Sequence, residues 1–261
     1  MKMVASELLT MSQLSLKVEL LTILKAMNHT AAHMTDEPLS AEDPGRKSGP
    51  EAEERVFRIV HEAIQQHRVQ PGQRLVEREL SEAANANRQA VRNALLRLAQ
   101  AGLVHLARHQ GARVMQCSPE TTHQIMEARI VNEGAALVLL AGRLDEAGRD
   151  RLQAILRQEA AAYDEGRIEE ARHFSRAFHV AFTELAGNAM IARFVHELID
   201  CQPLLGTRNP GRQSAFSGVT AHTRTLAALL RGDGQEAEAV NTQLLRALER
   251  EFLRESAEGP V

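Results

Sequence analysis

The sequence predicts a mainly α-helical protein in which a small domain of three helices and a β-hairpin is joined to an all-helical bundle. Residues that favour helices, above all alanine, leucine, glutamate and arginine, dominate the composition. Apolar residues recur at helical spacing through most of the chain after residue 50. Only the stretch from Leu103 to Gln116 has two β-prone arms around a glycine-containing turn. With 261 residues, the chain is long enough for two domains.

Residues 1–50 are expected to form a helical extension followed by a flexible linker. The stretch from Val4 to Met27 is apolar but interrupted by charged residues, and it lacks the continuous apolar region and cleavage site of a signal peptide. The run that begins at Met34 is rich in proline, glycine, serine and acids, which is typical of a linker. Translation could start at Met34, in which case the first 33 residues would be absent from the native protein.

Membrane-spanning and cysteine-stabilised classes are not indicated. No stretch approaches about 18 consecutive apolar residues, so we expect no membrane span and a cytoplasmic protein. Cys117 and Cys201 lie far apart and do not have the spacing of a metal-ligand pair. We therefore expect two free thiols in a reducing compartment.

Charge divides the chain into unequal parts. Residues 51–117 carry ten bases and seven acids, whereas residues 118–261 carry 16 bases and 21 acids. Between Ala83 and Pro119 there are five arginines and no acid. Such an asymmetry is expected when one domain meets a polyanion and the other does not.

The basic domain, residues 51–117, shows three helices and a hairpin in order. A first helix over 51–68 is followed by a second short helix that begins near Leu75. Asn87 is a suitable N-cap for a third helix, which Gly102 ends. With the hairpin that follows, this is the element order of a winged helix-turn-helix, whose third helix enters the DNA major groove.

The third helix carries side chains suited to reading DNA on its leading edge. Arg88, Gln89 and Arg92 would lie opposite the buried stripe, where they can bind base edges or phosphates. Polar residues of the hairpin are expected to reach the backbone or the minor groove: Arg108, His109 and Arg113. The alternative is an ordinary solvated face, since three helices and a hairpin also occur in proteins that bind no DNA. The absent acids and the element order favour DNA binding.

The stretch LVERELSEAANANRQAVRNALLRLAQAGLV resembles the signature of the GntR family of bacterial transcription regulators. Asn87 replaces the usual Ser or Thr, and Ala90 replaces the common Pro. The resemblance implies DNA contacts at Arg78, at Arg88 and Arg92, and at the hairpin glycine Gly111. The matching positions are Leu75, Glu77, Leu80, Arg88, Val91, Arg92, Ala94, Leu95, Leu98, Gly102 and Leu103.

The acidic part, residues 118–257, is predicted to be a bundle of helices with a ligand site in its interior. The predicted helices run over about 119–142, 145–163, 167–186, 188–204, 213–231 and 234–255. This part resembles the FCD effector domain of the FadR-type branch, which also implies a role in dimerisation. The residues that carry the resemblance are Arg129, Glu133, Phe178, His179, Gly187, Asn188, His222, Gly232 and Asp233.

The resemblance implies an effector site in the bundle. Its predicted residues are Arg129, Ser175, His179, Asn188 and His222. Arg129 suits a carboxylate or another anion, because its guanidinium can grip an anion with two donors. An ordinary histidine buried in the core is the alternative for each of the two histidines.

Many FCD relatives hold a divalent metal through an Asp four residues before the first His and through two later His residues. Here Ser175 stands at the Asp position and Leu244 at the last His position, so only His179 and His222 remain. Since transition metals generally need three or more protein ligands, we expect no tightly bound metal. A weakly bound divalent ion at the two histidines stays open, and no other cofactor is indicated.

These observations predict a ligand-responsive transcription regulator, a repressor of a catabolic or transport operon, that binds operator DNA as a homodimer and responds to a small anionic metabolite. Two alternatives stay open. A helical-bundle enzyme or ligand-binding protein could act on a small carboxylate, although no activated nucleophile, phosphate loop or metal motif is found. A protein-interaction module is the other, for which the Val4–Met27 helix is the only special feature.

Overall fold

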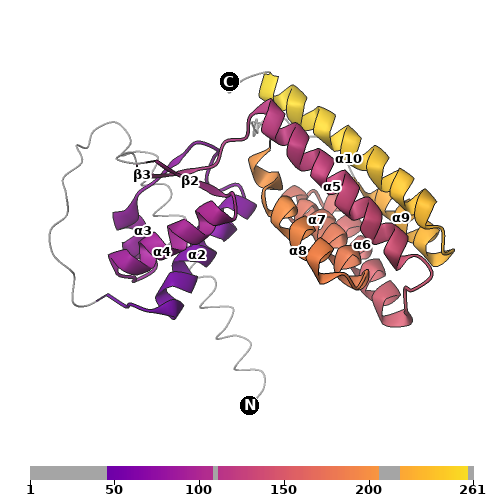
Figure 1. Ribbon diagram of the computed structural model, residues 1–261, viewed down its shortest axis with the longest axis horizontal. Coiled ribbons are helices and arrows are strands. Elements are labelled where there is room, and N and C mark those ends of the chain that lie inside the picture. The colour runs from indigo at the N-terminus through magenta and orange to yellow at the C-terminus, as the bar shows by residue number, and fades with distance from the viewer. Residues whose placement is uncertain (1–45, 108–110, 206–217, 258–261) are drawn as a thin grey trace, which may run out of the picture. The chain divides into compact units, whose positions relative to one another are not determined.

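The computed structural model describes residues 46–107, 111–205 and 218–257, and the chain divides into two compact units between Met115 and Gln116 (Figure 1). The predicted helix at Val4–Met27 and the hairpin residues Arg108 and His109 lie outside the described residues. Among the helices that are described, none combines the length and the apolar character needed to cross a membrane.

Three helices form the body of the first unit: α2 (Pro50–Gln65), α3 (Glu77–Ala83) and α4 (Arg88–Gln100). α4 packs against both α2 and α3 (Figure 1). The predicted buried stripe of α4 is confirmed, because each of its residues is at most 2% exposed: Val91, Ala94, Leu95 and Leu98. Burial of this stripe leaves the opposite side of α4 at the surface.

α4 begins and ends where the sequence predicts. Asn87 Oδ1 accepts a hydrogen bond from the amide of Ala90 at 2.9 Å, which satisfies one of the free amides of the first turn. Gly102, with φ of 73°, adopts the left-handed conformation that ends the helix at low cost.

The first unit also contains a three-stranded antiparallel sheet in the order β1-β3-β2. β2 (Val104–Ala107) and β3 (Gly111–Val114) form the predicted hairpin. The prediction that Leu75 lies in the second helix is wrong, because β1 (Arg74–Leu75) pairs with β3 and Leu75 lies opposite Ala112. A strand of two residues is too short to show a period of two in the sequence.

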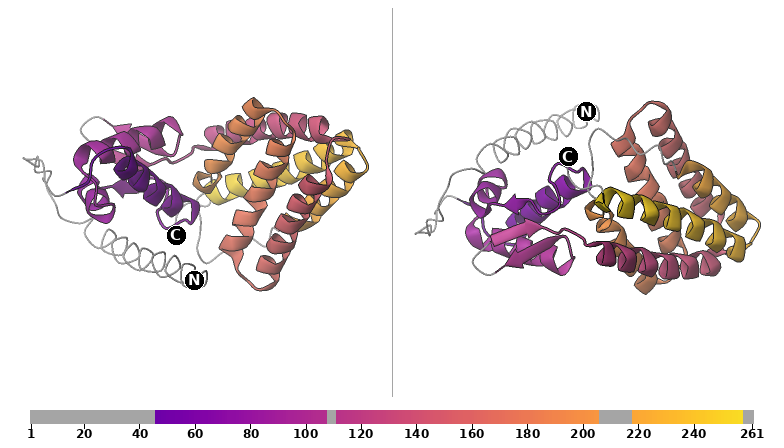
Figure 2. Two further views of the ribbon diagram at one scale, coloured as in Figure 1. Left: turned by 90° about the horizontal axis from the view of Figure 1, so that it is seen from below. Right: turned by 90° about the horizontal axis from the view of Figure 1, so that it is seen from above.

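The second unit is a bundle whose described helices are α5 (Pro119–Leu140), α6 (Glu146–Asp164), α7 (Ile168–Leu185), α8 (Ala189–Asp200), α9 (Val219–Leu230) and α10 (Gly234–Ala257). α5 packs along α10 and α6 packs along α7 (Figure 2). The core between them is apolar and fully buried, and it includes Leu137, Leu140, Leu152, Phe178, Phe182 and Leu229.

One predicted helix of the bundle is wrong in its extent. Residues 188–204 were expected to be continuous, but α8 ends at Asp200 and a short 3-10 helix, η1 (Gln202–Leu204), follows. Pro203 explains the break, because its ring excludes the amide hydrogen bond that a continuing α-helix needs. The helix expected from residue 213 begins at Val219 in the described residues.

Candidate functional site

The leading edge of α4 presents polar and cationic side chains to solvent. Gln89 and Arg92 are exposed, and Arg88 is half-buried at the first helical position. Arg92 Nε lies 3.4 Å from Glu77 Oε2 at the start of α3, while Gln89 Nε2 donates to Asn93 Oδ1 at 2.8 Å. These contacts lie at the surface, where they are easily exchanged for contacts with a ligand.

Arg97, in contrast, is used inside the first unit. Its guanidinium contacts Glu53 and Glu54 at 3.0 and 3.1 Å, and it lies 4.4 Å from the ring centroid of Phe57. These contacts join α4 to α2 on the side away from Arg92. Arg97 therefore supports the position of α4 and is not part of its leading edge.

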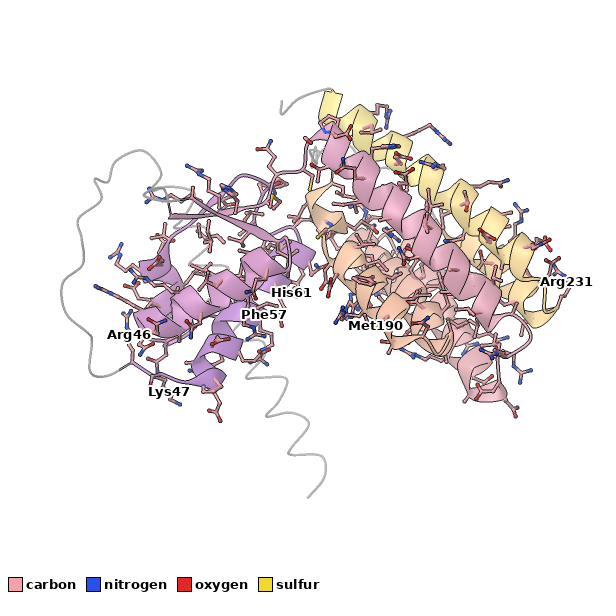
Figure 3. All side chains as sticks on the ribbon, viewed as in Figure 1. Arg46, Lys47, Phe57, His61, Met190 and Arg231 are labelled. Atoms are coloured by element: carbon pink, nitrogen blue, oxygen red, sulfur yellow. The ribbon has the colours of Figure 1, made fainter. Side chains whose placement is uncertain are left out.

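The chain just before α2 adds two cations that the sequence assigned to the flexible linker. Lys47 N donates to Asn85 O at 3.2 Å, and Asn87 N donates to Lys47 O at 2.8 Å. Arg46 contacts Ser81 and Glu82 of α3. Arg46 and Lys47 are labelled in Figure 3. Because its main chain is fixed beside the N-cap of α4, the exposed Lys47 side chain stands next to the leading edge.

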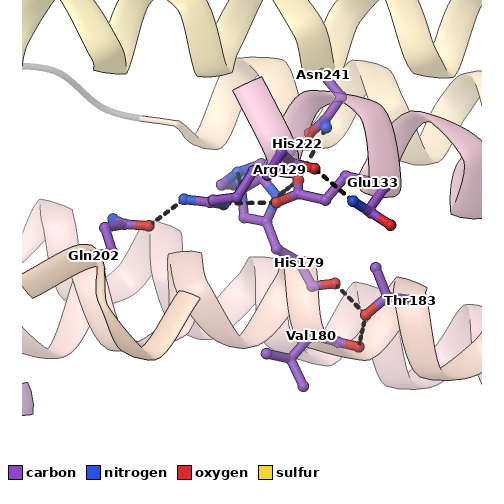
Figure 4. Close-up of polar contacts among 10 residues, drawn as sticks. Arg129, Glu133, His179, Val180, Thr183, Gln202, His222 and Asn241 are labelled. Atoms are coloured by element: carbon purple, nitrogen blue, oxygen red, sulfur yellow. Dashed lines mark hydrogen bonds and ion pairs between the residues drawn. The ribbon is translucent and has the colours of Figure 1, made fainter. Parts of the chain in front are cut away.

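In the second unit, a buried ion pair occupies the middle of α5 (Figure 4). Arg129 Nε donates to Glu133 Oε1 at 2.7 Å, and both side chains are fully buried. Arg129 Nη1 also donates to Gln202 Oε1 of η1 at 2.5 Å. Glu133 Oε2 accepts from His179 Nδ1 of α7 at 2.7 Å and from Asn241 Nδ2 of α10 at 3.0 Å. The pair therefore connects α5 to three other elements.

A second carboxylate orients the other histidine. His222 Nδ1 lies 2.8 Å from Glu159 Oε2, and both groups are buried. The two rings meet edge to face, with His222 Nε2 at 3.1 Å from His179 Nε2. The contact between the two Nε2 atoms can be a hydrogen bond only when one of them carries a proton, because two unprotonated ring nitrogens would both be acceptors.

Together these residues form a buried cluster, which consists of Arg129, Glu133, Glu159, His179, Gln202, His222 and Asn241. Opposing effects set the pKa values in this cluster. Burial alone would raise the pKa of Glu133, but the charges of Arg129 and His179 and the hydrogen bonds from His179 and Asn241 lower it to about 2. Burial lowers the pKa of His179, against the attraction of Glu133. Glu133 is therefore ionised at neutral pH, and the imidazole of His179 tends to be neutral.

Several buried polar atoms of the second unit lack a partner within the described residues. Arg129 Nη2, Glu159 Oε1, Thr225 Oγ1 and Asn241 Oδ1 are buried without a hydrogen bond. Such groups are costly to leave unpaired, so each points to water or a ligand. Arg129 Nη2 is a charged donor, which suits an acceptor of negative charge.

The comparisons with known proteins agree on both units. The model for bacterial regulatory proteins of the gntR family matches residues 52–114, and the FCD domain model matches residues 124–247. RspR, an HTH-type transcriptional repressor of Escherichia coli (strain K12), is 25% identical over 209 residues, which cover 75% of this chain and 86% of RspR. LutR, an HTH-type transcriptional regulator of Bacillus subtilis (strain 168), is 26% identical over 200 residues, covering 67% and 90%. The solved structure of E. coli McbR/YncC has the same fold, with a TM-score of 0.67, 19% identity and coverage of 79% of this chain and 99% of that one.

This chain belongs to the GntR family. It is a transcriptional regulator with an FCD effector-binding domain, and not an enzyme. GntR regulators bind operator DNA, and their FCD domains bind small-molecule effectors.

Among the DNA-binding residues predicted for this GntR regulator, Arg78 and Arg113 are exposed on α3 and β3. Arg113 Nη1 donates to Gly72 O at 3.1 Å. Gly111 begins β3 with φ of 75°, and open space surrounds the position of a Cβ, so its conformation rather than crowding requires glycine. Asn87 serves as the N-cap of α4.

Among the predicted effector residues, the structure brings together Arg129, His179 and His222. Ser175 is half-buried on α7, one turn before His179. The structure does not place Asn188 among these buried residues. Asn188 is exposed, its Oδ1 accepts hydrogen bonds from Met190 and Ile191 as the N-cap of α8, and its role toward an effector stays a prediction. Asx residues are common caps, and this role explains the motif.

Within the described residues, His179 and His222 lack the further ligands of the metal site that the FCD resemblance implies. Among the described residues, no group of three or more His, Cys, Asp or Glu could hold a metal ion. Leu244 is buried and supplies no donor atom. Each histidine has the carboxylate partner that commonly orients a metal ligand, but a third ligand is missing from the described part of the chain.

Sequence reasoning missed several members of the cluster. Glu159, Gln202 and Asn241 come from three different elements, and each is one polar residue among many on its helix. Arg176 of α7 is also buried, and burial lowers the pKa of Arg176 to about 10 against the attraction of Glu169. The signal that the sequence offered was a charged residue at a position that helical periodicity assigns to the buried side of a helix.

Proposed function

We propose that this GntR regulator is a homodimeric repressor whose operator binding is released by a small anionic metabolite held in the second unit. The observation that carries the DNA-binding part is the exposed edge of α4, where Arg88, Gln89 and Arg92 follow a capped N-terminus. A recognition helix reads base edges with residues near its N-terminus, and Arg and Gln form two-donor contacts with guanine and adenine.

Lys47 extends this surface toward the DNA backbone. Its main chain is fixed to Asn85 and Asn87, so its side chain starts beside the N-cap of α4. Lysine acts on phosphates as a point charge and does not distinguish sequences. We assign Lys47 and the hairpin residue Arg113 to phosphate contacts, and Arg88, Gln89 and Arg92 to base contacts.

Homodimerisation follows from the small footprint of one such domain. A single winged helix covers one half-site, whereas two linked domains gain affinity without new contacts and read a pseudo-palindromic operator. Repression is supported by the relative RspR, which is named a repressor and is 25% identical. Release by the effector requires that the effector binds the DNA-incompetent arrangement more tightly.

The anionic class of effector rests on Arg129. One guanidinium nitrogen, Nη2, is fully buried and has no hydrogen-bond partner among the described residues. The other donors of the same group are held by Glu133 and Gln202, so the guanidinium is fixed in orientation before a ligand arrives. A carboxylate that accepts from Nη2 would satisfy this donor and gain a charge-assisted hydrogen bond.

The proposal is tested with the full-length protein and the DNA upstream of its own reading frame. We expect salt-sensitive binding to this fragment that is tighter than binding to a random duplex of equal length by about 10³-fold or more. In a thermal-shift screen, small mono- and dicarboxylates serve as probes, with amides of the same shape as controls. A carboxylate that raises the Tm is then added to the DNA complex, where it should release the fragment.

Equal affinity for the two duplexes at every salt concentration would contradict the operator part of the proposal. An anion that raises the Tm but strengthens DNA binding would contradict release, and a neutral analogue that stabilises as well as its acid would contradict the anionic class.

A further inference from the structure

Gln89 occupies the most outward position on the leading edge of α4. Gln89 and Leu98 are nine positions apart, which is about two and a half helical turns, so their side chains point to opposite sides of the helix. Leu98 is fully buried in the core, and Gln89 is exposed. Because Gln89 is also the second residue of α4, its amide lies at the end of the helix that a recognition helix turns toward the bases.

A hydrogen bond within α4 fixes the orientation of this amide. Gln89 Nε2 donates to Asn93 Oδ1 at 2.8 Å, four positions further along the same face of the helix. Asn93 is half-buried, so its side chain has less freedom than that of Gln89. Among the described residues, no other side-chain hydrogen bond of Gln89 is found. One N–H group and the oxygen Oε1 of Gln89 are therefore left for a ligand.

The two remaining groups of Gln89 match one base. In the major groove, adenine presents the acceptor N7 beside the N6 amino donor, and a glutamine amide binds both at once. Guanine and thymine present acceptors, so Oε1 would face another acceptor at either of them, and cytosine presents only a donor. The bond to Asn93 stays intact while adenine is read, because it uses the other N–H group of Gln89.

We propose that Gln89 reads an adenine in the operator, and that Asn93 is a positioning residue that holds the Gln89 amide in the orientation adenine requires. The inference deepens the proposed function and rests on its assignment of Gln89 to a base contact. Neither residue is among the positions that match the GntR signature, so the pair sets a preference that the signature leaves open.

The contribution of Asn93 lies in ordering Gln89 before DNA is bound. A free glutamine side chain loses conformational freedom when it is immobilised at an interface, and this loss weakens binding. The bond to Asn93 restricts Gln89 in advance, so less freedom is lost at the adenine. A carboxylate in place of the Asn93 amide would accept the same bond but would repel the phosphates. Asparagine supplies the acceptor without a charge, in a stretch that contains no acid between Ala83 and Pro119.

The experiment selects binding sites from a library of random-sequence duplexes, with the full-length protein and its variants, and sequencing gives the preference at every base pair. We expect the unaltered protein to prefer adenine at one position of the half-site by at least about tenfold. Gln89→Ala should remove this preference and leave the preferences at the other positions. Gln89→Glu should change the preferred base to cytosine, because a carboxylate accepts from the cytosine amino group and cannot donate to adenine N7.

Two variants of Asn93 separate positioning from folding. Asn93→Ala removes the acceptor and should reduce the adenine preference by about three- to tenfold, with the preferences at the other positions unchanged. Asn93→Asp keeps the acceptor, so it should retain the adenine preference while its charge weakens binding to all duplexes alike. Unaltered circular dichroism and Tm show that the variants fold.

Gln124→Ala is the matched control for the loss of an exposed amide bond. Gln124 is exposed on α5 and donates to Glu120 at 2.9 Å, also across four positions. This variant should leave every base preference unchanged, because the bond that it removes lies in the second unit.

Different results would overturn the two parts of the inference. An unchanged set of preferences in Gln89→Ala would remove Gln89 from base reading. An Asn93→Ala variant with the full adenine preference, or an Asn93→Asp variant that loses it as Asn93→Ala does, would overturn the positioning role. A selection that enriches no sequence would overturn operator binding, and with it this inference. An enriched site that lacks these changes would overturn the inference while the proposed function stands.

Discussion

Arg92 is the side chain on which base reading by α4 is most directly tested. Its guanidinium is exposed, and among the described residues its ion pair is with the surface carboxylate of Glu77, so removing it should change the fold little. We expect Arg92→Ala to weaken operator binding by about 1–3 kcal/mol and to relax preference at one base position. Fluorescence anisotropy with single-base operator variants measures both effects. Arg172→Ala, in a comparable surface pair with Glu169, is the control that should leave affinity unchanged.

Lys47 should behave differently, because a phosphate contact carries no sequence information. Lys47→Ala is expected to weaken binding to operator and random duplex by the same factor, and to reduce the slope of log affinity against log salt by about 1. The main-chain hydrogen bonds to Asn85 and Asn87 stay in place, so the Tm should hold. Lys47→Arg should retain the slope. A loss confined to the operator would assign Lys47 to base reading instead.

Because Glu133 is held ionised, we expect the free energy of unfolding to depend on pH in the acid range. Its folded pKa of about 2 lies below the unfolded value of 4.5, so its contribution is fully present above pH 4.5 and is lost as the pH falls toward 2. We expect Glu133→Gln to be less stable at pH 6, and its deficit to shrink by roughly 3 kcal/mol between pH 6 and pH 2. Urea unfolding of both proteins across this range gives the deficit. A deficit that does not change with pH would mean that Glu133 is not held ionised.

At the scale of the element, the N-cap of α4 is expected to affect both the stability of the first unit and DNA binding. Asn87 Oδ1 accepts a hydrogen bond from the amide of Ala90, and the amide of Asn87 donates to the main-chain oxygen of Lys47. We expect Asn87→Ala to lower the free energy of unfolding of the first unit by about 1 kcal/mol, and Asn87→Ser to retain most of it. Chemical unfolding followed by a probe in the first unit measures this loss. Equal losses in the two variants would show that the cap hydrogen bond contributes little.

Helices and strands could be predicted from the sequence where several local signals, such as a capping residue and an apolar stripe, agreed. α4 has a capping residue, an apolar stripe and a glycine stop, and all three signals are found in place. β1 and η1 were missed, because a strand of two residues and a single turn around Pro203 have no periodicity. Both depend on pairing or packing with residues distant in sequence.

The buried cluster was predictable only in part, for a similar reason. The resemblance pointed to Arg129, His179 and His222, which the structure brings together. It could not supply Glu159 and Asn241, since the hydrogen bonds that matter join residues 63 and 108 positions apart. Partners at such separations are set by how helices pack, not by spacing along one helix.

At the scale of the whole molecule, the proposed function requires that anion binding to the second unit changes the free energy of operator binding by the first unit. If an anion at Arg129 weakens operator binding by some factor, the operator must weaken binding of that anion by the same factor. The reciprocity holds for any mechanism that connects the units. It therefore tests whether the second unit regulates the first without knowledge of the path between them.

The last prediction uses this reciprocity with one conservative change. We expect a carboxylate that releases the operator to bind the protein–DNA complex more weakly than the free protein by the factor that release implies, typically about 5- to 150-fold. Arg129→Lys retains the charge beside Glu133, which limits the cost of an unpaired buried carboxylate, but it removes the donor Nη2. This variant should keep operator affinity and lose the response to the carboxylate, as measured by calorimetry with and without operator. Unaltered Tm in the absence of ligand shows that it folds, and a folded Arg129→Lys variant with a full response would remove Arg129 from the effector site.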